Sequence, residues 1–338
     1  MRALMYEGPW QMPLRELPEP SPGPGEVVVA VQAAGICGSD VHGFTGSTGR
    51  RTPGIVMGHE FSGTVAALGA NVASWAVGDR VVVQPLHRCG SCAMCRSGRG
   101  NICQNRTLIG MHVHGAYAEA VNVPQAQLYR LPDDLSYEHG AWAEPLSVAL
   151  HAVAITPLNL LDTVVVVGAG PIGLLTLQVA RRRGAGTIIV TDRNAHRLEV
   201  ARQLGADLVV NIADDDPIQR VQQATDGLGA DVTFEAVGIT PTVQQALAVT
   251  RVGGTITWIG NSAPEVTLNM QQVVTREITI RGTYGFDREF GQAIDLLRSQ
   301  QISVTPLIEG IAPLAEGPQI FQQLADGTLE SIKVILQP

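Results

Sequence analysis

The hydrophobic pattern of the chain changes near residue 155, and the part before this point is built from short apolar runs. These valine-rich runs alternate with turn residues and lie at Val27–Val31, Gly63–Leu68, Arg80–Gln84 and Glu119–Val123. Many short strands at such spacing are typical of β sandwiches and barrels. Four prolines between Pro18 and Pro24 exclude a helix there. The first part is therefore predicted to be a β-rich, barrel-like domain.

From about residue 155 the chain alternates between apolar runs and amphipathic segments. Thr163–Val167 is a continuous apolar or β-branched run, as expected for a strand buried on both faces. A glycine-rich turn and a helix to Arg183 follow. The next expected elements are a strand at Thr187–Thr191, a helix at Arg193–Leu204, and strands at Leu208–Asn211, Asp231–Glu235 and Thr255–Ile259. Strands alternating with helices predict an α/β fold with a doubly wound parallel sheet.

The two ends of the chain complete the predicted organisation. The N-terminus, Met1–Glu7, has no apolar signal core and is predicted to be a first strand. Residues 287–300 have the pattern of a helix, and the chain ends in a predicted strand that returns to the first domain. The longest uncharged stretch, 163–180, is broken by glycines and a proline, which favours strand, turn and helix over a membrane helix. We expect a cytoplasmic protein.

Composition narrows the function classes. The net charge is −8 and aromatic residues make up 4% of the 338 residues, so the chain lacks the basic, stacking surface of a nucleic-acid binder. Lys333 is the sole lysine and lies in the predicted last strand. Schiff-base and P-loop chemistry both need a lysine at the reacting centre, so both are disfavoured. The expected partner is a small molecule, with neither nucleic acid nor a membrane involved.

A glycine motif predicts a dinucleotide site. The pattern G-x-G-x-x-G follows the strand at Thr163–Val167 and opens a helix, with the residues Gly168, Ala169, Gly170, Pro171, Ile172 and Gly173. The first glycine turns the chain, the second lets the backbone approach a pyrophosphate, and the third lets helix and strand pack closely. The helix N-terminus then offers free N–H groups to the phosphates.

An acidic residue at the end of the next strand extends this motif. Asp192 stands 24 positions after Gly168, where a carboxylate can accept hydrogen bonds from the adenosine ribose. The carboxylate would repel a 2′-phosphate, which favours NAD over NADP. The neighbouring Arg193 would weaken that preference. The alternative is that Asp192 is only a turn acid or a helix N-cap.

Four of the five cysteines form a dense motif with metal-ligand spacing. They follow the pattern C-x2-C-x2-C-x7-C, at Cys89, Cys92, Cys95 and Cys103. An odd cysteine count in a chain without a secretion signal favours metal over disulfides. Four thiolates fill the tetrahedral shell of a structural zinc and leave no position for chemistry. An iron–sulfur cluster is the alternative occupant.

A second group of candidate ligands is spread along the chain. Cys37 is the remaining cysteine, His59 and Glu60 are adjacent, and Glu144 lies further on. A catalytic zinc takes three protein ligands and keeps one exchangeable position. By residue type alone this grouping is weak, because a lone cysteine or histidine is more often a core or surface residue than a ligand.

The motifs taken together resemble the zinc-dependent medium-chain dehydrogenases, in particular the branch of polyol, galactitol-phosphate and threonine dehydrogenases. The resemblance runs nearly the whole length and includes Gly35–Asp40, Gly58–Gly63, Val77–Val81, the four-cysteine loop, Gly115–Glu119, Glu144–Ser147 and the glycine motif. It implies a GroES-like catalytic domain over residues 1–152 with a structural-zinc loop at 89–103. It further implies a Rossmann NAD-binding domain over 153–286 and a return to the catalytic domain over 287–338.

The resemblance assigns two zinc ions per chain. Cys37, His59 and Glu60 would hold the catalytic zinc, and the four-cysteine loop would hold the structural one. Glu144 occupies the place of a second cysteine in ethanol-type enzymes and lies beside the metal in the polyol branch. We hypothesise that Glu144 ligates the resting metal and leaves when substrate needs its position.

The implied reaction is hydride transfer from a secondary alcohol or polyol, including a sugar alcohol or its phosphate, to NAD. Zinc would activate the substrate hydroxyl. Ser39 matches the start of the proton relay of the family, and His42 is a later member; the alternative for His42 is a surface loop residue. Asp40 would support the metal site without reacting.

Other functions on the same scaffold stay open. Sorbitol enzymes carry a substrate-contacting arginine in the loop where this chain has Gly285, which argues against sorbitol itself. A threonine, amino-alcohol or small-diol dehydrogenase is the alternative enzyme. An NAD-binding scaffold without catalysis is the non-enzyme alternative, although every expected ligand is present. By resemblance the protein would be a homodimer or homotetramer.

Overall fold

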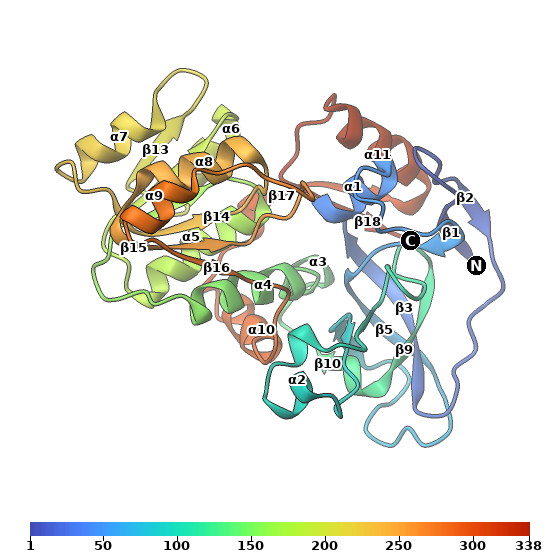
Figure 1. Cartoon of the computed structure of the whole chain (residues 1–338). Helices are drawn as coiled ribbons and strands as arrows, with labels where there is room; N and C mark the ends of the chain where they lie inside the picture. Colours follow the sequence, from blue (N-terminus) through green and yellow to red (C-terminus); the bar gives the residue numbers. More distant parts are fainter. The chain divides into compact units, whose positions relative to one another are not determined.

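The computed structural model describes residues 1–338 and divides into two compact units (Figure 1). The first unit comprises Met1–Glu144 and Phe290–Pro338, and the second comprises Pro145–Glu289. None of the helices has the length and apolar character needed to cross a membrane.

The first unit is built around a seven-stranded sheet with the order β10-β6-β5-β3-β18-β17 and with β9 also paired to β3. Its strands are β3 (Glu26–Gly35), β5 (Glu60–Leu68), β6 (Arg80–Val83), β9 (Ala120–Pro124), β10 (Leu128–Arg130), β17 (Ile308–Pro313) and β18 (Lys333–Gln337). Two smaller sheets hold β1 (Arg2–Tyr6), β2 (Leu14–Glu16) and β4 (Ile55–Val56), and β7 (Leu86–His87) and β8 (Thr107–Leu108). The predicted β-rich character of this part is confirmed.

The C-terminal strand lies deep within this sheet. β18 pairs antiparallel with β3, with Ile335 opposite Gly35 and Leu336 opposite Ala34. On its other side β3 pairs with β5, and Gly35 lies opposite Glu60. The last residues of the chain are therefore brought next to segments from its first sixty residues.

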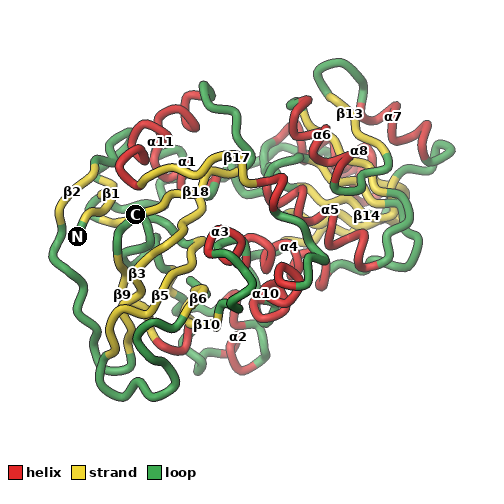
Figure 2. The backbone as a smooth tube through the Cα atoms, turned by 180° about the vertical axis from the view of Figure 1, so that it is seen from behind, coloured by secondary structure: helices red, strands yellow, loops and turns green.

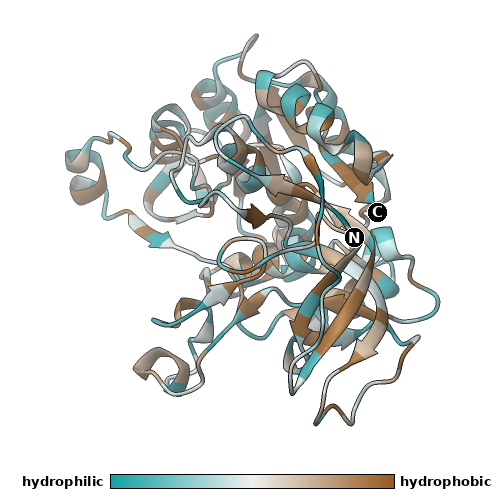
Figure 3. Ribbon diagram, turned by 90° about the vertical axis from the view of Figure 1, so that its right-hand side faces the viewer, coloured by the Kyte–Doolittle hydropathy of each residue, from teal (hydrophilic) through white to brown (hydrophobic).

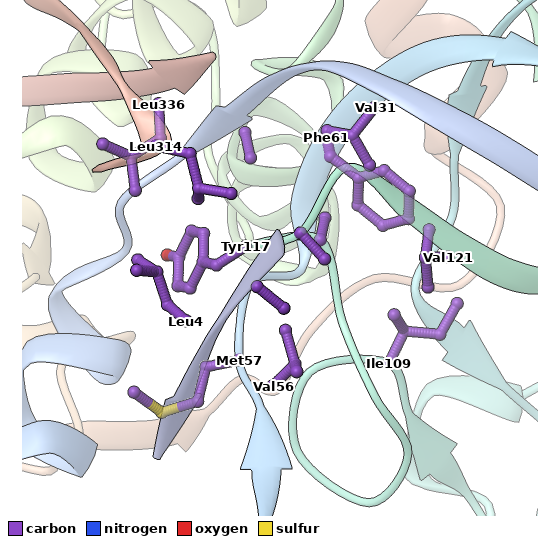
Figure 4. Close-up of a cluster of buried hydrophobic side chains, with 14 of the residues drawn as sticks. Leu4, Val31, Val56, Met57, Phe61, Ile109, Tyr117, Val121, Leu314 and Leu336 are labelled. Carbon is purple, nitrogen blue, oxygen red and sulfur yellow. The ribbon is translucent and has the colours of Figure 1, made fainter. Parts of the chain in front are cut away.

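The core of the first unit fills the space beside these strands with side chains from both ends of the sequence. In Figure 4, Leu4, Tyr117 and Leu336 point into one cluster, although they come from strands and loops far apart in the chain. Phe321 packs edge-on against Tyr117 at a ring-centroid distance of 5.4 Å. Hydrophobic segments recur along the strands near the chain termini in Figure 3. This burial is the main force holding the unit together.

Short helices complete the first unit. They are α1 (Gly38–Thr45), α2 (Ala93–Arg96), α3 (Tyr137–Gly140), α10 (Phe290–Arg298) and α11 (Gly317–Asp326), with α4 (Ala143–Ile155) beginning at the end of this unit and continuing in the second. The helix expected over 287–300 is α10 and is shorter at both ends. Its N-terminal side is an irregular turn, where Glu289 accepts hydrogen bonds from the backbone N–H groups of Asp287 and Arg288.

The second unit contains a parallel six-stranded sheet with the order β13-β12-β11-β14-β15-β16. The strands are β11 (Val164–Val167), β12 (Ile188–Asp192), β13 (Leu208–Asn211), β14 (Ala230–Glu235), β15 (Thr250–Trp258) and β16 (Thr279–Gly282). The strand order reverses between β11 and β14, as in a doubly wound fold. The predicted α/β fold class is confirmed.

Helices cover both faces of this sheet, as the red segments flanking the yellow strands in Figure 2 show. They are α5 (Pro171–Arg183), α6 (Ala195–Gln203), α7 (Pro217–Ala224), α8 (Thr240–Val249) and α9 (Met270–Thr275). Val165 and Val167 share one core with Val221 of α7 and Leu247 of α8. Helix α6 begins at Ala195 because the Asn194 side chain caps it by accepting a hydrogen bond from the Arg197 N–H.

Candidate active site

Three candidate metal ligands from two distant segments converge in the first unit. Cys37 ends the loop after β3, whereas His59 and Glu60 stand at the start of β5. The ligand atoms of these three residues all lie within 4.8 Å of one another. Two ligands of one zinc ion lie at most about 4.6 Å apart, because each bond is about 2.0–2.3 Å long. Small side-chain adjustments therefore suffice for one ion to contact all three.

Local backbone features place each of these ligands. Cys37 is the N-cap of α1, where the free N–H groups of a helix favour a thiolate. Gly58, just before His59, has φ of +98°. A Cβ at Gly58 would lie 2.9 Å from the backbone nitrogen of Tyr117, so the turn that presents His59 requires glycine.

The donor set fits zinc. A thiolate, an imidazole and a carboxylate are the ligand types that Zn²⁺ combines in catalytic sites. His59 and Glu60 are buried, at 5% and 2% exposure. Cys37 is half-buried, and Lys333 is a single cation beside Glu60, so an ionised thiol and the nearby carboxylates Glu60 and Asp40 leave room for further positive charge. The observed clustering is therefore what a divalent cation would stabilise.

Asp40 supports this cluster from behind His59. Its carboxylate is fully buried and lies 3.4 Å from His59 Nδ1, too long for a well-formed hydrogen bond but close enough for strong electrostatic attraction. Arg51 Nη2 donates to Asp40 Oδ1 at 2.8 Å, and the Tyr117 hydroxyl donates to Oδ2 at 2.7 Å. Burial opposes ionisation of Asp40, but His59 and Arg51 outweigh it and lower the pKa of this carboxyl.

The contact with Asp40 also changes the pKa of His59. Burial lowers the pKa of His59, but the negative charges of Asp40 and Cys37 outweigh burial and raise the pKa well above its ordinary value. The imidazole thus stands in a strongly cation-attracting environment. A metal ion bound to its other nitrogen would satisfy that field, with Asp40 orienting the ring.

Lys333 contacts the candidate site, and sequence reasoning missed it. Its Nζ donates to Glu60 Oε2 at 2.6 Å and to the Ile36 carbonyl at 3.0 Å, and its side chain is 3% exposed. By residue type, a sole lysine suggests only Schiff-base or P-loop chemistry, which its place in the last predicted strand disfavours. A sole lysine within the apolar run of the last strand was the available signal, because a buried lysine needs an anionic partner.

Glu144 lies near the three converging ligands without being one of them. It stands in the first turn of α4 and is half-buried. Burial raises the pKa of Glu144 to about 7, and the charges of His59 and Lys333 act in the opposite direction. The exchange between this carboxylate and substrate remains a hypothesis.

The residues expected to carry the proton lie on α1. Ser39 Oγ is 3.4 Å from Cys37 Sγ, so the hydroxyl stands beside the candidate metal position. His42 is half-buried one turn further along the helix, and burial lowers its pKa. A neutral imidazole is the form that accepts a proton near neutral pH.

The four-cysteine loop forms a second metal cage. The sulfur atoms of Cys89, Cys92, Cys95 and Cys103 lie within 4.8 Å of one another. Cys103 Sγ lies 3.5 Å from Cys89 Sγ and 3.8 Å from Cys92 Sγ, and all four cysteines are free of disulfides. Tetrahedral zinc with bonds of about 2.3 Å separates its sulfur ligands by about 3.8 Å. The distances fit one zinc ion.

Backbone N–H groups point at these sulfur atoms. The N–H of Cys92 donates to Cys89 Sγ at 3.4 Å, and the N–H of Asn105 donates to Cys103 Sγ at 3.3 Å. Hydrogen bonds from the N–H groups of Ser91 and Cys92 lower the pKa of Cys89 to about 5. Burial and the neighbouring thiols Cys92 and Cys103 instead raise the pKa of Cys95 to about 12. Bound metal would favour the thiolate, the form in which cysteine binds metal, at all four positions.

The glycine motif lies at the carboxyl end of β11, beside the reversal of strand order. Gly168 has φ of +99°, and Gly170 is the N-cap of α5 with open space around it. Pro171 and Ile172 form the first turn of this helix. A Cβ on Gly173 would lie 1.8 Å from the Gly168 carbonyl oxygen, so only glycine fits there. The loop therefore leaves a helix N-terminus free for a pyrophosphate.

Asp192 ends β12 beside this loop. Its Oδ2 accepts a hydrogen bond from the Ala169 N–H at 2.6 Å, and its Oδ1 accepts one from the Asn194 N–H at 2.8 Å. The acid thus fixes the glycine loop, and its remaining lone pairs can accept ribose hydroxyls. Arg193 beside it is exposed. The helix cap is Asn194 and not Asp192, so the N-cap alternative for Asp192 is wrong.

Comparisons with known proteins match this architecture. Residues 23–133 match the alcohol dehydrogenase GroES-like domain and residues 171–299 match the zinc-binding dehydrogenase domain. Sorbitol dehydrogenase of Bacillus subtilis is 35% identical, with 100% of this chain and 97% of that protein covered. D-arabitol-phosphate dehydrogenase of Enterococcus avium is 36% identical over 97% of this chain and 94% of its own.

Solved structures agree. A zinc-binding dehydrogenase from Sinorhizobium meliloti, solved with NADP, is 33% identical with a TM-score of 0.93, covering 100% of this chain and 99% of that chain. Similarity of this extent decides the family. The chain is a zinc-binding alcohol and polyol dehydrogenase. As a member of this family it is an oxidoreductase with a GroES-like domain and a Rossmann-type sheet, and it uses zinc and a nicotinamide dinucleotide.

We expect Cys92→Ser to remove the metal from the four-cysteine loop of this dehydrogenase, because three thiolates no longer close the cage. Metal analysis should fall by about one zinc per chain, and the loop at 89–103 should become sensitive to protease. Ser91→Ala, which keeps all four sulfurs, is the matched control. An unchanged zinc content in the Cys92 variant would contradict the assignment.

Two glycines of the same loop should respond differently to alanine. Gly173→Ala places Cβ against the Gly168 carbonyl and should destabilise the fold by about 1–3 kcal/mol or more. Gly170→Ala meets open space and should fold normally but bind NADH weakly, because Cβ occupies the approach of the pyrophosphate. Urea unfolding and NADH fluorescence titration measure the two effects. Equal stability loss in both variants would refute this division.

Proposed function

We propose that the protein oxidises a secondary alcohol or polyol, free or phosphorylated, and passes the hydride to NAD. The proposal is carried by one observation: Cys37, His59 and Glu60, from distant segments, bring their ligand atoms within 4.8 Å of one another. The relatives named for sorbitol and arabitol phosphate support a substrate with several hydroxyl groups. The glycine loop and Asp192 supply the place for the dinucleotide.

The three ligands and the residues around them can each be given a function. Cys37, His59 and Glu60 would hold the catalytic zinc, with Glu144 beside it as an exchangeable fourth group. When bound, the zinc supplies Lewis-acid chemistry that makes a substrate hydroxyl acidic at neutral pH. Asp40 holds the His59 ring in place, and Arg51 and Tyr117 hold Asp40. A buried, charged support therefore lies against the His59 ligand.

The proton of the hydroxyl needs a path to solvent, and α1 offers one. We assign the first acceptor to Ser39, whose hydroxyl lies beside Cys37. His42, whose pKa burial lowers, would take the proton on towards solvent.

A small diol or an amino alcohol such as threonine is the second candidate substrate. Gly285 stands where sorbitol enzymes carry a substrate-contacting arginine, and its φ is +55°. An arginine would be strained in this left-handed conformation, so the loop follows a path suited to glycine. Without the arginine, the site has fewer hydrogen-bond donors for the hydroxyl groups of a long polyol.

The assembly state belongs to the same proposal. β16 is the edge of the six-stranded sheet, and most of its residues are exposed. An exposed edge strand is a template for pairing with a second chain. A homodimer or homotetramer is therefore proposed, and light scattering tests it; a monomer at micromolar concentration would refute it.

The central test follows NADH absorbance with a panel of polyols, polyol phosphates, small diols and threonine. Wild-type protein with about two zinc ions per chain should reduce NAD with at least one class. Cys37→Ser should keep the structural zinc, lose the catalytic one, and reduce kcat/KM by at least about 100-fold, because Lewis-acid activation supplies several kcal/mol. No turnover of any compound by zinc-replete wild type would refute the proposal.

The choice of cofactor has its own test. Asp192→Ser removes the charge that repels a 2′-phosphate while leaving Arg193 beside it, so the ratio of kcat/KM for NADP over NAD should rise by about 10- to 100-fold. Asp207→Ser, on the next strand connection, is the control. A wild-type preference for NADP would overturn the assigned preference.

A further inference from the structure

Two buried cations lie near the candidate zinc ligands, and each pairs with a different carboxylate. Arg51 binds Asp40, which in turn faces His59, so this cation stands one residue away from the ligands. Lys333 binds Glu60 directly, and both side chains are at most 3% exposed. Its ammonium also lies 5.4 Å from the centroid of the Trp142 ring, which favours a cation there. Lys333 is therefore the cation in contact with a candidate ligand.

The sheet is built to let this pair form. Glu60 on β5 and Lys333 on β18 flank β3 from opposite sides and meet over Gly35. A Cβ on Gly35 would lie 2.6 Å from Glu60 Oε2 and 3.5 Å from Lys333 Cδ. Gly35 does not have a positive φ, so its backbone conformation does not call for glycine. The missing side chain at this position makes room for the carboxylate and the lysine.

Lys333 and a metal ion would share one carboxylate. Glu60 Oε2 is taken up by the ammonium, which leaves the other oxygen as the better ligand. With zinc bound, the charges of one thiolate, two carboxylates, the metal and Lys333 sum to zero. Without Lys333 the same set would be anionic and would hold the metal more tightly. Lys333 stays paired with Glu60 when the metal leaves, so the carboxylate is not left unpaired in the interior.

We propose that Lys333 is the positioning residue for Glu60: it fixes Oε2, limits the carboxylate to one metal-facing oxygen, and weakens the hold of Glu60 on the metal. The inference rests on the proposed function. It goes beyond that function by making the strength of the contact between Glu60 and the metal depend on β18. Lys333 itself neither touches substrate nor transfers a proton.

The test compares wild type, Lys333→Met and Lys333→Arg after cobalt is placed in the Cys37 site. In the Met variant, Glu60 has no other partner, so dipicolinic acid should remove cobalt about 10- to 100-fold more slowly and kcat should fall by a similar factor. The cobalt absorption bands should shift towards higher coordination. The Arg variant should restore both. Zinc release from the four-cysteine loop is the internal control and should be unchanged in all three proteins.

Gly35→Ala is an independent variant that keeps every charge. Its Cβ would displace Glu60 Oε2 from the ammonium, so the cobalt spectrum and release rate should change in the same direction as in Lys333→Met. This variant carries the test if the Met protein does not fold. The inference would be overturned if either variant lost cobalt faster than wild type. It would also be overturned if both variants kept the wild-type spectrum and kcat, because Lys333 would then be only structural. Failure of the proposed function is separate, because wild type itself would then show no metal-dependent turnover.

Discussion

The first unit depends on matching buried charges within its interior. Asp40 and Glu60 are both removed from water, and ionised carboxylates are costly there unless each finds a cation or several donors. Arg51 and Tyr117 serve Asp40, and Lys333 serves Glu60. These contacts join the first turn of α1, the loops that hold Arg51 and Tyr117, and the strands β5 and β18. Hydrophobic burial supplies most of the stability, but this charge pattern determines which segments can meet.

Strand β3 is where these requirements come together. It is paired with β5, β9 and β18, so it connects the beginning, middle and end of the first unit. At its end Gly35 leaves space for the ion pair, and its carbonyl oxygen lies 3.0 Å from the Tyr117 hydroxyl that contacts Asp40. Cys37 follows two residues later. A strand that is central to folding therefore also delivers the thiol to the candidate metal site.

The strands and the glycine loop of the second unit could be predicted from local sequence patterns. Its parallel strands are continuous apolar runs, and the glycine motif lies within six residues, so the elements and the loop could be located from the sequence. The four-cysteine loop is similarly local, because its ligands lie within fifteen residues. Boundaries were less accurate where a cap decided them: α6 starts at Ala195 because Asn194, and not the strand-end acid, caps it.

Long-range contacts mark the limit of sequence reasoning in the candidate site. Lys333 and Glu60 are 273 residues apart, and Tyr117 and Asp40 are 77 apart. No periodicity or spacing links such positions, and lysine in an apolar strand has the same local pattern whether its partner is a ligand or a surface acid. Arg51 was missed for the same reason, since its loop contains two adjacent arginines and only one is buried against Asp40.

The long sequence separation between Lys333 and the candidate ligands bears on how the protein is made. Cys37, His59 and Glu60 leave the ribosome well before β18, because Lys333 follows Glu60 by 273 residues. A growing chain can therefore gather all three ligands while the cation that moderates them is still missing. On the charge argument above, such a chain would hold a divalent ion tightly. Once β18 has paired with β3, Lys333 would reach Glu60 and weaken its hold on the metal.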